Sequence, residues 1–363
     1  AYDLEVLNIG KDVTYIAEQA FFHCYELKEI NFVAGGTKPL EIEDGAFLDV
    51  AKLKKITLPA RLARLDGVAT LDACKALVTI NAEVGGEFFG SVDGMLTNGV
   101  RDTILYCPPM RQGALEIPVG ITAIGDNAFA NRTELTSLVV PAWVESIGAN
   151  AFQNCSMLRS VEFVGGRNGN LTIGNNAFAG NKVLSSVSFP GGATKDLGNV
   201  TIGDFAFANC DKLLTLVMND NANIQSIGNN AFEGCSMGEL RIAASIISVG
   251  DNAFANCDEM TTVEFAENCG DIQFGAAVFT GCNIRSVELP STIQNFNGGV
   301  FQGCDTIAEI KVDPANPYLE SVGGVLYNKG QTELLFYPQS KSVDFADSVF
   351  FRVHIYHLIS YSP

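Results

Sequence analysis

Residues 147–155 read IGANAFQNC, and this nine-residue phrase decides the fold. Clear copies fill the middle of the chain, with their phenylalanines at Phe129, Phe152, Phe178, Phe207, Phe232 and Phe254. Weaker copies end at Phe21, Phe47, Phe279 and Phe301, and a degenerate copy ends near Leu71. From Phe129 to Phe301 successive copies lie 22 to 29 residues apart. Units of this length bury their apolar side on their neighbours, so the sequence predicts a repeat solenoid of about ten or eleven coils.

The residues after each phenylalanine follow the pattern x-x-C-x-x-L-x-x-[IVL]-x-[FVIL], as at Cys282, Val287 and Leu289. The alternation at the end of this pattern predicts a half-buried strand. The glycine after the isoleucine is expected to allow a tight turn with unusual backbone angles. The Ala-Phe pair is expected in a turn-like or short helical connector, with the ring in the core. The predicted fold is therefore a leucine-rich-repeat-like, right-handed stack of strand, turn and short-helix coils that forms one parallel sheet.

Two segments interrupt the period and resemble each other. They are residues 92–108 and 322–338, and each reads as two short strands around an Asn-centred turn. Such a pattern predicts a β-hairpin that replaces the connector of one coil. After the second segment, residues 343–346 read as a re-entry into the repeat. We expect one solenoid over residues 1–345 and an irregular tail over 346–363. The tail is either a cap or a place where the chain is cut or altered after Ser348, and the second is favoured because caps are normally polar outside.

The phrases SIGANAFQNCSMLRSVEF and VGDNAFANCDEMTTVEF resemble the BspA-type leucine-rich repeat family, and the interleaved VGGVLYNKGQTELLFYP segment is typical of it. The resemblance covers roughly residues 14–345. It implies a surface-exposed or secreted protein of the kind found in gut and oral bacteria, associated with adhesion to host matrix proteins and with co-aggregation. The family shares no catalytic centre, so the resemblance implies no site residue.

Composition excludes several classes of partner. The chain has 23 basic and 41 acidic residues, for a net charge of −18. Such a chain repels nucleic-acid phosphates and anionic membrane surfaces. It contains no apolar run long enough to span a membrane, and its polar start at residues 1–5 is not a signal peptide. We expect a cell-surface or secreted protein from which the signal segment has been removed.

Eight of the ten cysteines fall at or near one repeat position: Cys24, Cys74, Cys155, Cys210, Cys235, Cys257, Cys282 and Cys304. Asn131 and Asn181 are taken to occupy that position in two other coils. Cysteine is a small hydrophobe with a weak donor, and asparagine can bond backbone groups, so the pattern predicts a buried structural ladder. Disulfides between adjacent coils are the alternative. Cys107 and Cys269 lie outside the ladder.

The sequence gives no sign of catalysis, a metal or a cofactor. It has no Cys-x-x-Cys pair and no phosphate-binding glycine fingerprint, and its histidines are His23, His354 and His357. These three histidines give little support for a Ser-His-Asp or Cys-His catalytic arrangement. We expect a non-enzymatic protein without a cofactor.

The outward positions of the predicted strands are the best candidate for a binding surface. They are rich in serine and threonine in the middle of the chain and in carboxylates towards its end. The candidate binding residues are Glu162, Glu239, Arg241, Glu264, Glu288 and Glu309, with a cation or basic-peptide site around the last three glutamates.

The predicted function is a binding and adhesion scaffold for host or bacterial proteins, with a host matrix protein as a candidate partner. An ordinary solvated sheet face remains open as an alternative, as does a structural spacer that presents another module. A carbohydrate-binding module is disfavoured because this face has almost no aromatic residues and Trp143 lies in a predicted loop.

Overall fold

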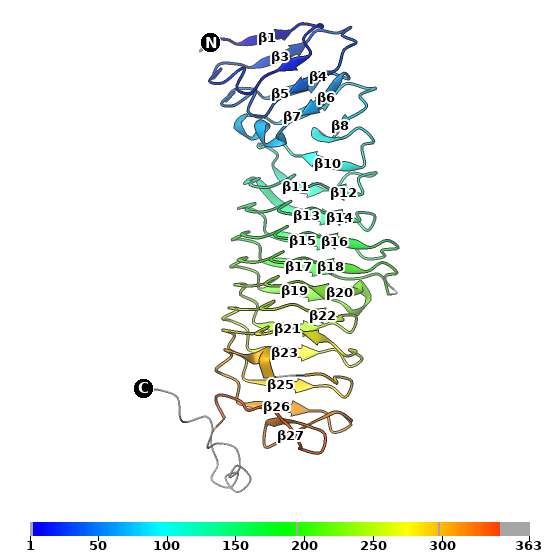
Figure 1. Cartoon of the computed structure of the whole chain (residues 1–363), viewed down its shortest axis with the longest axis vertical. Helices are drawn as coiled ribbons and strands as arrows, with labels where there is room; N and C mark the ends of the chain where they lie inside the picture. The colour runs from blue at the N-terminus through cyan, green and yellow to red at the C-terminus, as the bar shows by residue number, and fades with distance from the viewer. Residues whose placement is uncertain (1–2, 194, 297, 342–363) are drawn as a thin grey trace, which may run out of the picture.

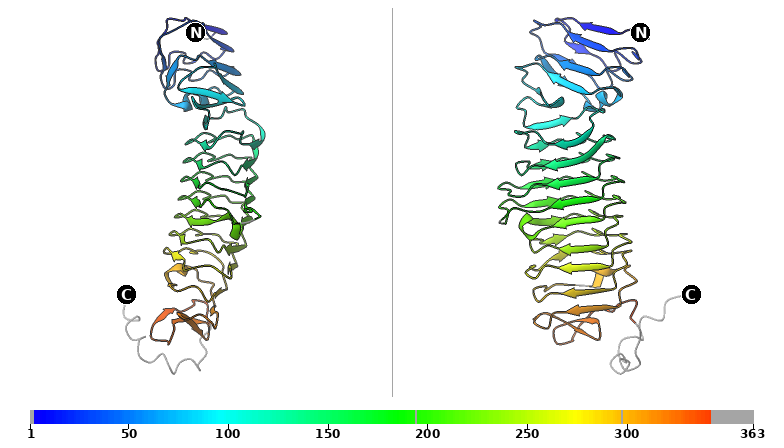
Figure 2. Two further views of the ribbon diagram at one scale, coloured as in Figure 1. Left: turned by 90° about the vertical axis from the view of Figure 1, so that its right-hand side faces the viewer. Right: turned by 180° about the vertical axis from the view of Figure 1, so that it is seen from behind.

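The protein is a long stack of coils, shown by a computed structural model that describes residues 3–193, 195–296 and 298–341 (Figure 1). The described residues make about 13 turns, two or three more than the copies of the phrase suggest. The additional turns arise because a strand precedes the first copy and another strand, residues 113–116, follows the first inserted hairpin. The stack runs from the N-terminal coil at one end to the second hairpin at the other (Figures 1 and 2).

One strand of each coil contributes to what we call the first face. Its strands pair in parallel within four groups: β1 with β3, β5 with β7, β11 to β19, and β21 to β26. These strands are the alternating segments expected from the sequence. Their bounds are β1 Val6–Ile9, β3 Glu29–Phe32, β5 Lys55–Leu58, β7 Thr79–Ala82, β11 Gly113–Glu116, β13 Leu135–Val140, β15 Ser160–Phe163, β17 Ser186–Phe189, β19 Thr215–Met218, β21 Glu239–Ile242, β23 Thr262–Phe265, β25 Ser286–Leu289 and β26 Glu309–Val312.

A second strand in most coils builds a second face, which the sequence did not predict. In most coils it ends at the isoleucine position of the phrase, and it is only two to four residues long, too short for alternation to be recognised. Most coils therefore have two strands where one was expected, and the Ala-Phe connector that follows the second strand is mostly turn, as expected. The members of the second face are β2 Tyr15–Ile16, β4 Leu40–Ile42, β6 Leu62–Leu65, β10 Thr103–Tyr106, β12 Ala123–Ile124, β14 Ser146–Ile147, β16 Leu171–Ile173, β18 Val200–Ile202, β20 Ile224–Ile227, β22 Ser248–Val249 and β24 Gln273–Phe274.

Helical structure is sparse. The described residues contain three short 3₁₀ helices, Val68–Ala73, Asp220–Ala222 and Gly298–Phe301. The Ala-Phe connectors of the other coils are turns. The expected short helix is thus the exception in this stack.

Both predicted hairpins are present, and each has one strand more than expected. The first consists of β8 Phe89–Val92, β9 Met95–Asn98 and β10, and the second of β27 Leu319–Val322, β28 Val325–Asn328 and β29 Leu334–Phe336. The Asn-centred turns are confirmed: the Asn98 side chain accepts from the Asp102 amide at 3.1 Å, and Asn328 accepts from the Glu333 amide at 2.8 Å. The expected re-entry at 343–346 and the tail lie outside the described residues.

A column of phenylalanine rings fills the centre of the stack. Eight rings from successive coils stack with centroids 4.7 to 5.8 Å apart, and most are within 14° of parallel. All are fully buried: Phe129, Phe152, Phe178, Phe207, Phe232, Phe254, Phe279 and Phe301. Their spacing matches the roughly 4.8 Å between paired strands, so ring stacking and backbone pairing favour the same geometry.

The reason expected for the glycine of the phrase is wrong. These glycines are absent from the residues with positive φ. Glycine occupies this position because the coils approach closely: a Cβ on Gly228 would lie 2.6 Å from the carbonyl carbon of Gly203. The left-handed backbone occurs two residues before the phenylalanine, where Asn127, Asn150, Asn176, Asn230 and Asn252 have φ of 54° to 58°. Asparagine tolerates this conformation better than most residues, which explains its frequency in the phrase.

The cysteine ladder is confirmed. In six coils the thiol donates to the carbonyl of a phenylalanine in the preceding coil, as Cys155 does to Phe129 at 3.1 Å and Cys257 to Phe232 at 3.3 Å. Asn181 fills the same position, and its Nδ2 donates to the Phe152 carbonyl at 3.0 Å. All ten cysteines are buried free thiols, and Cys107 and Cys269 do lie outside the ladder.

One residue of the ladder was assigned wrongly. Asn131 lies two residues after its phenylalanine, in a column of left-handed residues that includes Asn154 and Asn209. The ladder position, three residues after Phe129, holds Arg132, which is only 2 % exposed. Its Nε donates to the Cys107 carbonyl at 2.6 Å, the role that a thiol has elsewhere.

The phenylalanine column gives a stability prediction. Phe207→Ala removes a ring with stacked neighbours on both sides, so the free energy of unfolding should fall by about 3–5 kcal/mol. Urea denaturation followed by circular dichroism measures this. Phe205→Asn is the matched control: Phe205 is 40 % exposed and has φ of 55° where other coils have asparagine. It should leave stability unchanged or raise it, and an equal loss in both variants would contradict a central role for the column.

Burial of the ladder gives a prediction for pH. Desolvation raises the pKa of Cys74, Cys155 and Cys210 to about 12. These thiols should therefore resist iodoacetamide in the folded protein at about pH 8 and react only after unfolding. Because the pKa of each thiol is higher in the folded than in the unfolded protein, these thiols favour the folded state at pH values below the unfolded pKa. The free energy of unfolding should therefore fall as pH rises from about 9 towards 12. Rapid alkylation of these cysteines in the folded protein would contradict their placement.

Candidate interaction surface

The outward residues of the first face form two parallel rows across the stack. Along each strand buried residues alternate with these outward residues, as in β15, where Val161 and Phe163 are buried and Glu162 is exposed. The strand register aligns equivalent positions of neighbouring coils. The first row contains Ser137, Ser160, Ser186, Thr215, Glu239, Thr262, Ser286 and Glu309, and the second contains Val139, Glu162, Ser188, Val217, Arg241, Glu264, Glu288 and Lys311.

Five of the six candidate residues are brought together by the last four strands. Glu239 and Arg241 lie on β21, Glu264 on β23, Glu288 on β25 and Glu309 on β26. Glu162 lies on β15, three strands before β21, so it is not part of this group. The placement on one outward face agrees with the sequence analysis.

Two cations reduce the charge of this acidic group. Arg241 donates to both carboxylate oxygens of Asp220 at 3.0 and 2.8 Å, and this hydrogen-bonded pair lowers the pKa of Asp220. The Arg241–Asp220 pair bridges the gap in the first face between β19 and β21, which do not pair with each other. Lys311 lies opposite Glu288 and contacts Glu309 at 3.1 Å.

The carboxylates therefore do not form a metal cage. No group of three or more metal-ligating side chains is found in the described part of the chain. Arg241 serves the stack itself, whereas Glu239, Glu264 and Glu288 have no ion partner among the described residues.

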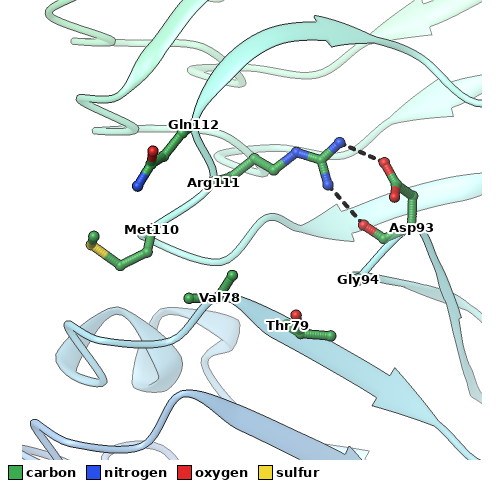
Figure 3. A pocket seen from close by; sticks show the side chains of 7 residues that line it. All are labelled: Val78, Thr79, Asp93, Gly94, Met110, Arg111 and Gln112. Carbon is green, nitrogen blue, oxygen red and sulfur yellow. Dashed lines mark hydrogen bonds and ion pairs between the residues drawn. The ribbon is translucent and has the colours of Figure 1, made fainter.

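A hollow of about 460 Å³ interrupts the first face where β7 and β11 do not pair. Arg111 crosses it and donates to the backbone carbonyl of Asp93 at 2.9 Å and to its carboxylate (Figure 3). The exposed side chains of Val78 and Met110 form its apolar end. Its lining is Val78, Thr79, Asp93, Gly94, Met110, Arg111 and Gln112.

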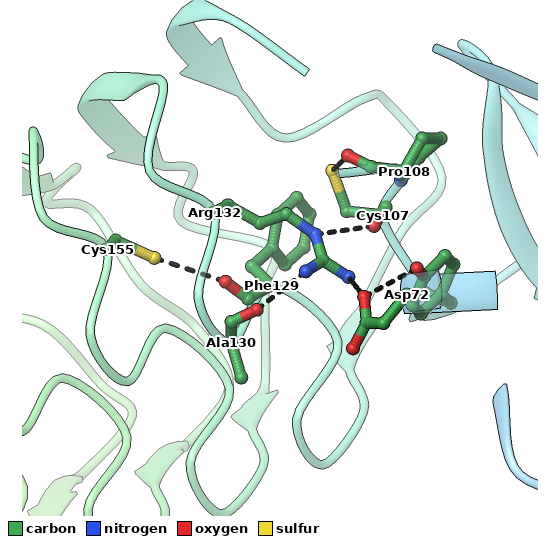
Figure 4. Close-up of polar contacts among 8 residues, drawn as sticks. Asp72, Cys107, Pro108, Phe129, Ala130, Arg132 and Cys155 are labelled. Carbon is green, nitrogen blue, oxygen red and sulfur yellow. Dashed lines mark hydrogen bonds and ion pairs between the residues drawn. The ribbon is translucent and has the colours of Figure 1, made fainter. Parts of the chain in front are cut away.

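Beneath this interruption the apolar core divides into two clusters. One extends from Ile9 to Tyr106 and the other from Met95 to Leu326, so the first hairpin contributes to both. The division coincides with Arg132, whose guanidinium contacts Asp72 at 2.9 Å and lies 4.8 Å above the ring centre of Tyr106 (Figure 4). The Tyr106 hydroxyl donates to the same carboxylate at 2.6 Å. A polar joint therefore connects the two apolar clusters.

Neither the hollow nor the polar joint was predicted from the sequence. A signal for Arg132 was present, because arginine replaces cysteine in an otherwise regular copy of the phrase. The hollow had no comparable signal, since it depends on where the hairpin turn meets the neighbouring coil.

Nothing in the geometry of the described residues assembles a nucleophile with a base. The ladder thiols are buried, and burial raises the pKa of Cys74, Cys155 and Cys210. His23 contacts Asp49 at 3.2 Å and lies against Phe22 and Tyr25. In the residues that the structure covers, no helix combines the length and apolar character that crossing a bilayer requires.

Comparison with known proteins decides the family. The model of the BspA-type leucine-rich repeat region matches in six copies, over residues 1–89, 108–199 and 172–308. The chain belongs to the BspA-type leucine-rich repeat family. This membership accounts for the recurring phrase across the matched residues. A search of curated proteins found no significant sequence match.

Several solved structures resemble this BspA-type chain. The pneumococcal vaccine antigen PcpA is 18 % identical with a TM-score of 0.52, and the match covers 86 % of this chain and 64 % of PcpA. A leucine-rich repeat protein from Eubacterium ventriosum is 17 % identical with a TM-score of 0.48, covering 82 % and 81 %. A leucine-rich cell surface protein from Faecalibacterium prausnitzii is 21 % identical with a TM-score of 0.39, covering 94 % and 64 %. The chain thus spans less than two thirds of the length of PcpA, and the likeness to PcpA concerns the fold.

The polar joint gives a test. Asp72→Asn leaves the buried guanidinium of Arg132 without its carboxylate. Because Asp72 is itself 37 % exposed, we expect a loss of about 2–3 kcal/mol in unfolding free energy, below the value for a fully buried pair. Asp211→Asn breaks the Lys182 pair, whose side chains are 56 % and 53 % exposed, and serves as the control. The control should cost about 1 kcal/mol or less. If urea denaturation gave similar losses for the two variants, the Asp72–Arg132 pair would contribute no more than an exposed ion pair.

Proposed function

We propose that this chain is a non-enzymatic scaffold, at the cell surface or secreted, that binds a protein partner through its first face. The observation that carries the proposal is the alignment of outward side chains over the strands of this face. A flat, regular polar surface over a rigid apolar column suits recognition by shape and charge. Membership of the BspA-type family supports the location and the adhesive role.

The partner that fits best presents basic side chains. Glu239, Glu264 and Glu288 come from three successive strands, and they have no ion partner among the described residues. The register places Glu264 beside Glu288, one residue beyond the paired Val263 and Val287. Adjacent like charges on a surface attract a cationic partner and steer its approach. A basic segment of a host matrix protein has this chemistry.

A structural spacer is the second candidate. The continuous column from Phe129 to Phe301 makes this part of the stack a rigid rod, which could hold another module at a distance. Binding by the isolated chain separates the two functions, because a spacer has no ligand of its own.

Charge reversal on the first face tests the proposal. The chain is screened against immobilised matrix proteins by biolayer interferometry, and the tightest is used as the probe. Glu264→Lys combined with Glu288→Lys should weaken binding about tenfold or more while the circular dichroism spectrum stays unchanged. Asp258→Lys with Asp305→Lys makes the same charge change on exposed turns of the neighbouring connectors and should have little effect. Equal affinity of the first double variant and the unaltered chain would refute the assignment of this face.

A further inference from the structure

A second hollow lies among the N-terminal coils, away from the acidic strands. It holds about 400 Å³ and is lined by Lys28, Ala51, Lys52, Lys54 and Ala76. These residues lie on the edge where each connector leads into a strand of the first face, in the blue part of Figure 1. The two alanines leave space between stacked coils, and the three exposed lysines surround it. The hollow is therefore small, open and cationic.

The charge of this edge changes sign along the stack. Residues 24–29, 50–55 and 74–79 contain five lysines and two glutamates. The same edge of the later coils, from Cys155 onwards, carries six acidic residues against four basic ones: Asp211, Glu239, Asp258, Glu259, Asp305 and Glu309 with Arg159, Lys182, Lys212 and Arg285. In a chain of net charge −18, five lysines in three successive coils form a local exception. An anionic ligand would find its favourable potential here and be repelled elsewhere.

The lysines can exchange their present partners for a ligand. Lys28 contacts Glu5 at 2.7 Å and Lys52 contacts Glu26 at 2.6 Å, with both lysine side chains 51 % exposed. Exposed pairs of this kind contribute little stability, so an incoming anion can compete for the ammonium groups. Lys54 has no ion pair among the described residues and is the cation most available to a ligand.

Aromatic side chains lie on the same edge. Tyr25 occupies in its coil the position that Ala51 occupies in the next, one residue after the ladder position, and it is 38 % exposed. Its ring stacks on His23 at 5.0 Å, and the neighbouring Phe22 is 39 % exposed. Exposed aromatic rings offer an apolar platform on which a sugar ring can pack, while lysines bind its acidic substituents.

We propose that this hollow, lined by Lys28, Lys52 and Lys54 on the edge that also carries Tyr25, binds a short anionic saccharide bearing carboxylate or sulfate groups. An extended polyanion such as a nucleic acid would also cross the acidic coils, whereas a short saccharide meets only the lysine cluster. The site is independent of the protein-binding face, because it uses other residues at the opposite end of the stack.

The test measures saccharide binding to the whole chain by calorimetry at low ionic strength. The probes are a heparin-derived hexasaccharide, which carries sulfates, a hyaluronan hexasaccharide, which carries carboxylates alone, and maltohexaose, which is neutral. We expect the anionic probes to bind with an affinity that falls as salt is added, and maltohexaose not to bind. Binding of heparin alone identifies sulfate as the ligand group, and binding of both shows that a carboxylate suffices.

Variants distinguish a site from general charge attraction. Lys54→Glu with Lys52→Glu should raise the Kd at least tenfold, because both line the hollow, whereas Lys182→Glu with Lys212→Glu, an equal charge change on the later edge, should leave it within about twofold. Tyr25→Ala should raise the Kd about threefold without changing its salt dependence, because it removes packing and no charge.

Three results would overturn the proposal. The first is no binding of either anionic saccharide at low ionic strength. The second is equal weakening by the two lysine variants. The third is binding of a poly-glutamate peptide that is as tight as that of the saccharides and is unchanged by Tyr25→Ala. This result would make the hollow a site for an acidic polypeptide.

Discussion

Face-to-face stacking of one phenylalanine per coil is the interaction on which the rest of the stack depends. The rings from Phe129 to Phe301 repeat at 4.7 to 5.8 Å, close to the distance between paired strands. Because ring and backbone share one spacing, each coil must approach its neighbour closely, and only glycine fits at positions such as Gly228. The same spacing brings each ladder thiol to the carbonyl of a phenylalanine one coil away. Core residues are thus tightly constrained, while the outward positions can vary with the ligand.

Features that repeat were predictable from the sequence, and features that depend on a single contact were not. The alternating strands and the buried cysteines recur often enough to be recognised. The same alternation made the outward placement of Glu264 and Glu288 predictable. Strands such as Ser146–Ile147 are too short to show a period, so the second face was missed. Asn131 was assigned one position away from the ladder because asparagine also fills the adjacent left-handed position. The Arg241–Asp220 pair and both hollows depend on side-chain geometry between coils, which no periodicity encodes.

The stack has a direction, because its two ends carry different chemistry. Lysines gather around Lys54 in the first coils, and unpaired carboxylates gather around Glu264 in the last. A coil contacts mainly the coils before and after it, so a change of surface charge in one leaves distant coils unaffected. Such a scaffold can offer separate ligands separate places along one rod.

The joint at Arg132 has a mechanical meaning. A rod under tension yields at its weakest cross-section, and here the apolar core is continuous everywhere except where it passes through the first hairpin. At that section the described contacts are an ion pair, the Tyr106 hydroxyl, the Arg111 contact across the open face and backbone hydrogen bonds such as that from Met110 to Leu77. A pull along the axis would therefore load polar and backbone contacts at this section, and apolar packing on either side of it. In the proposed adhesive role, such a section would set the force that the rod transmits between the two surfaces it joins.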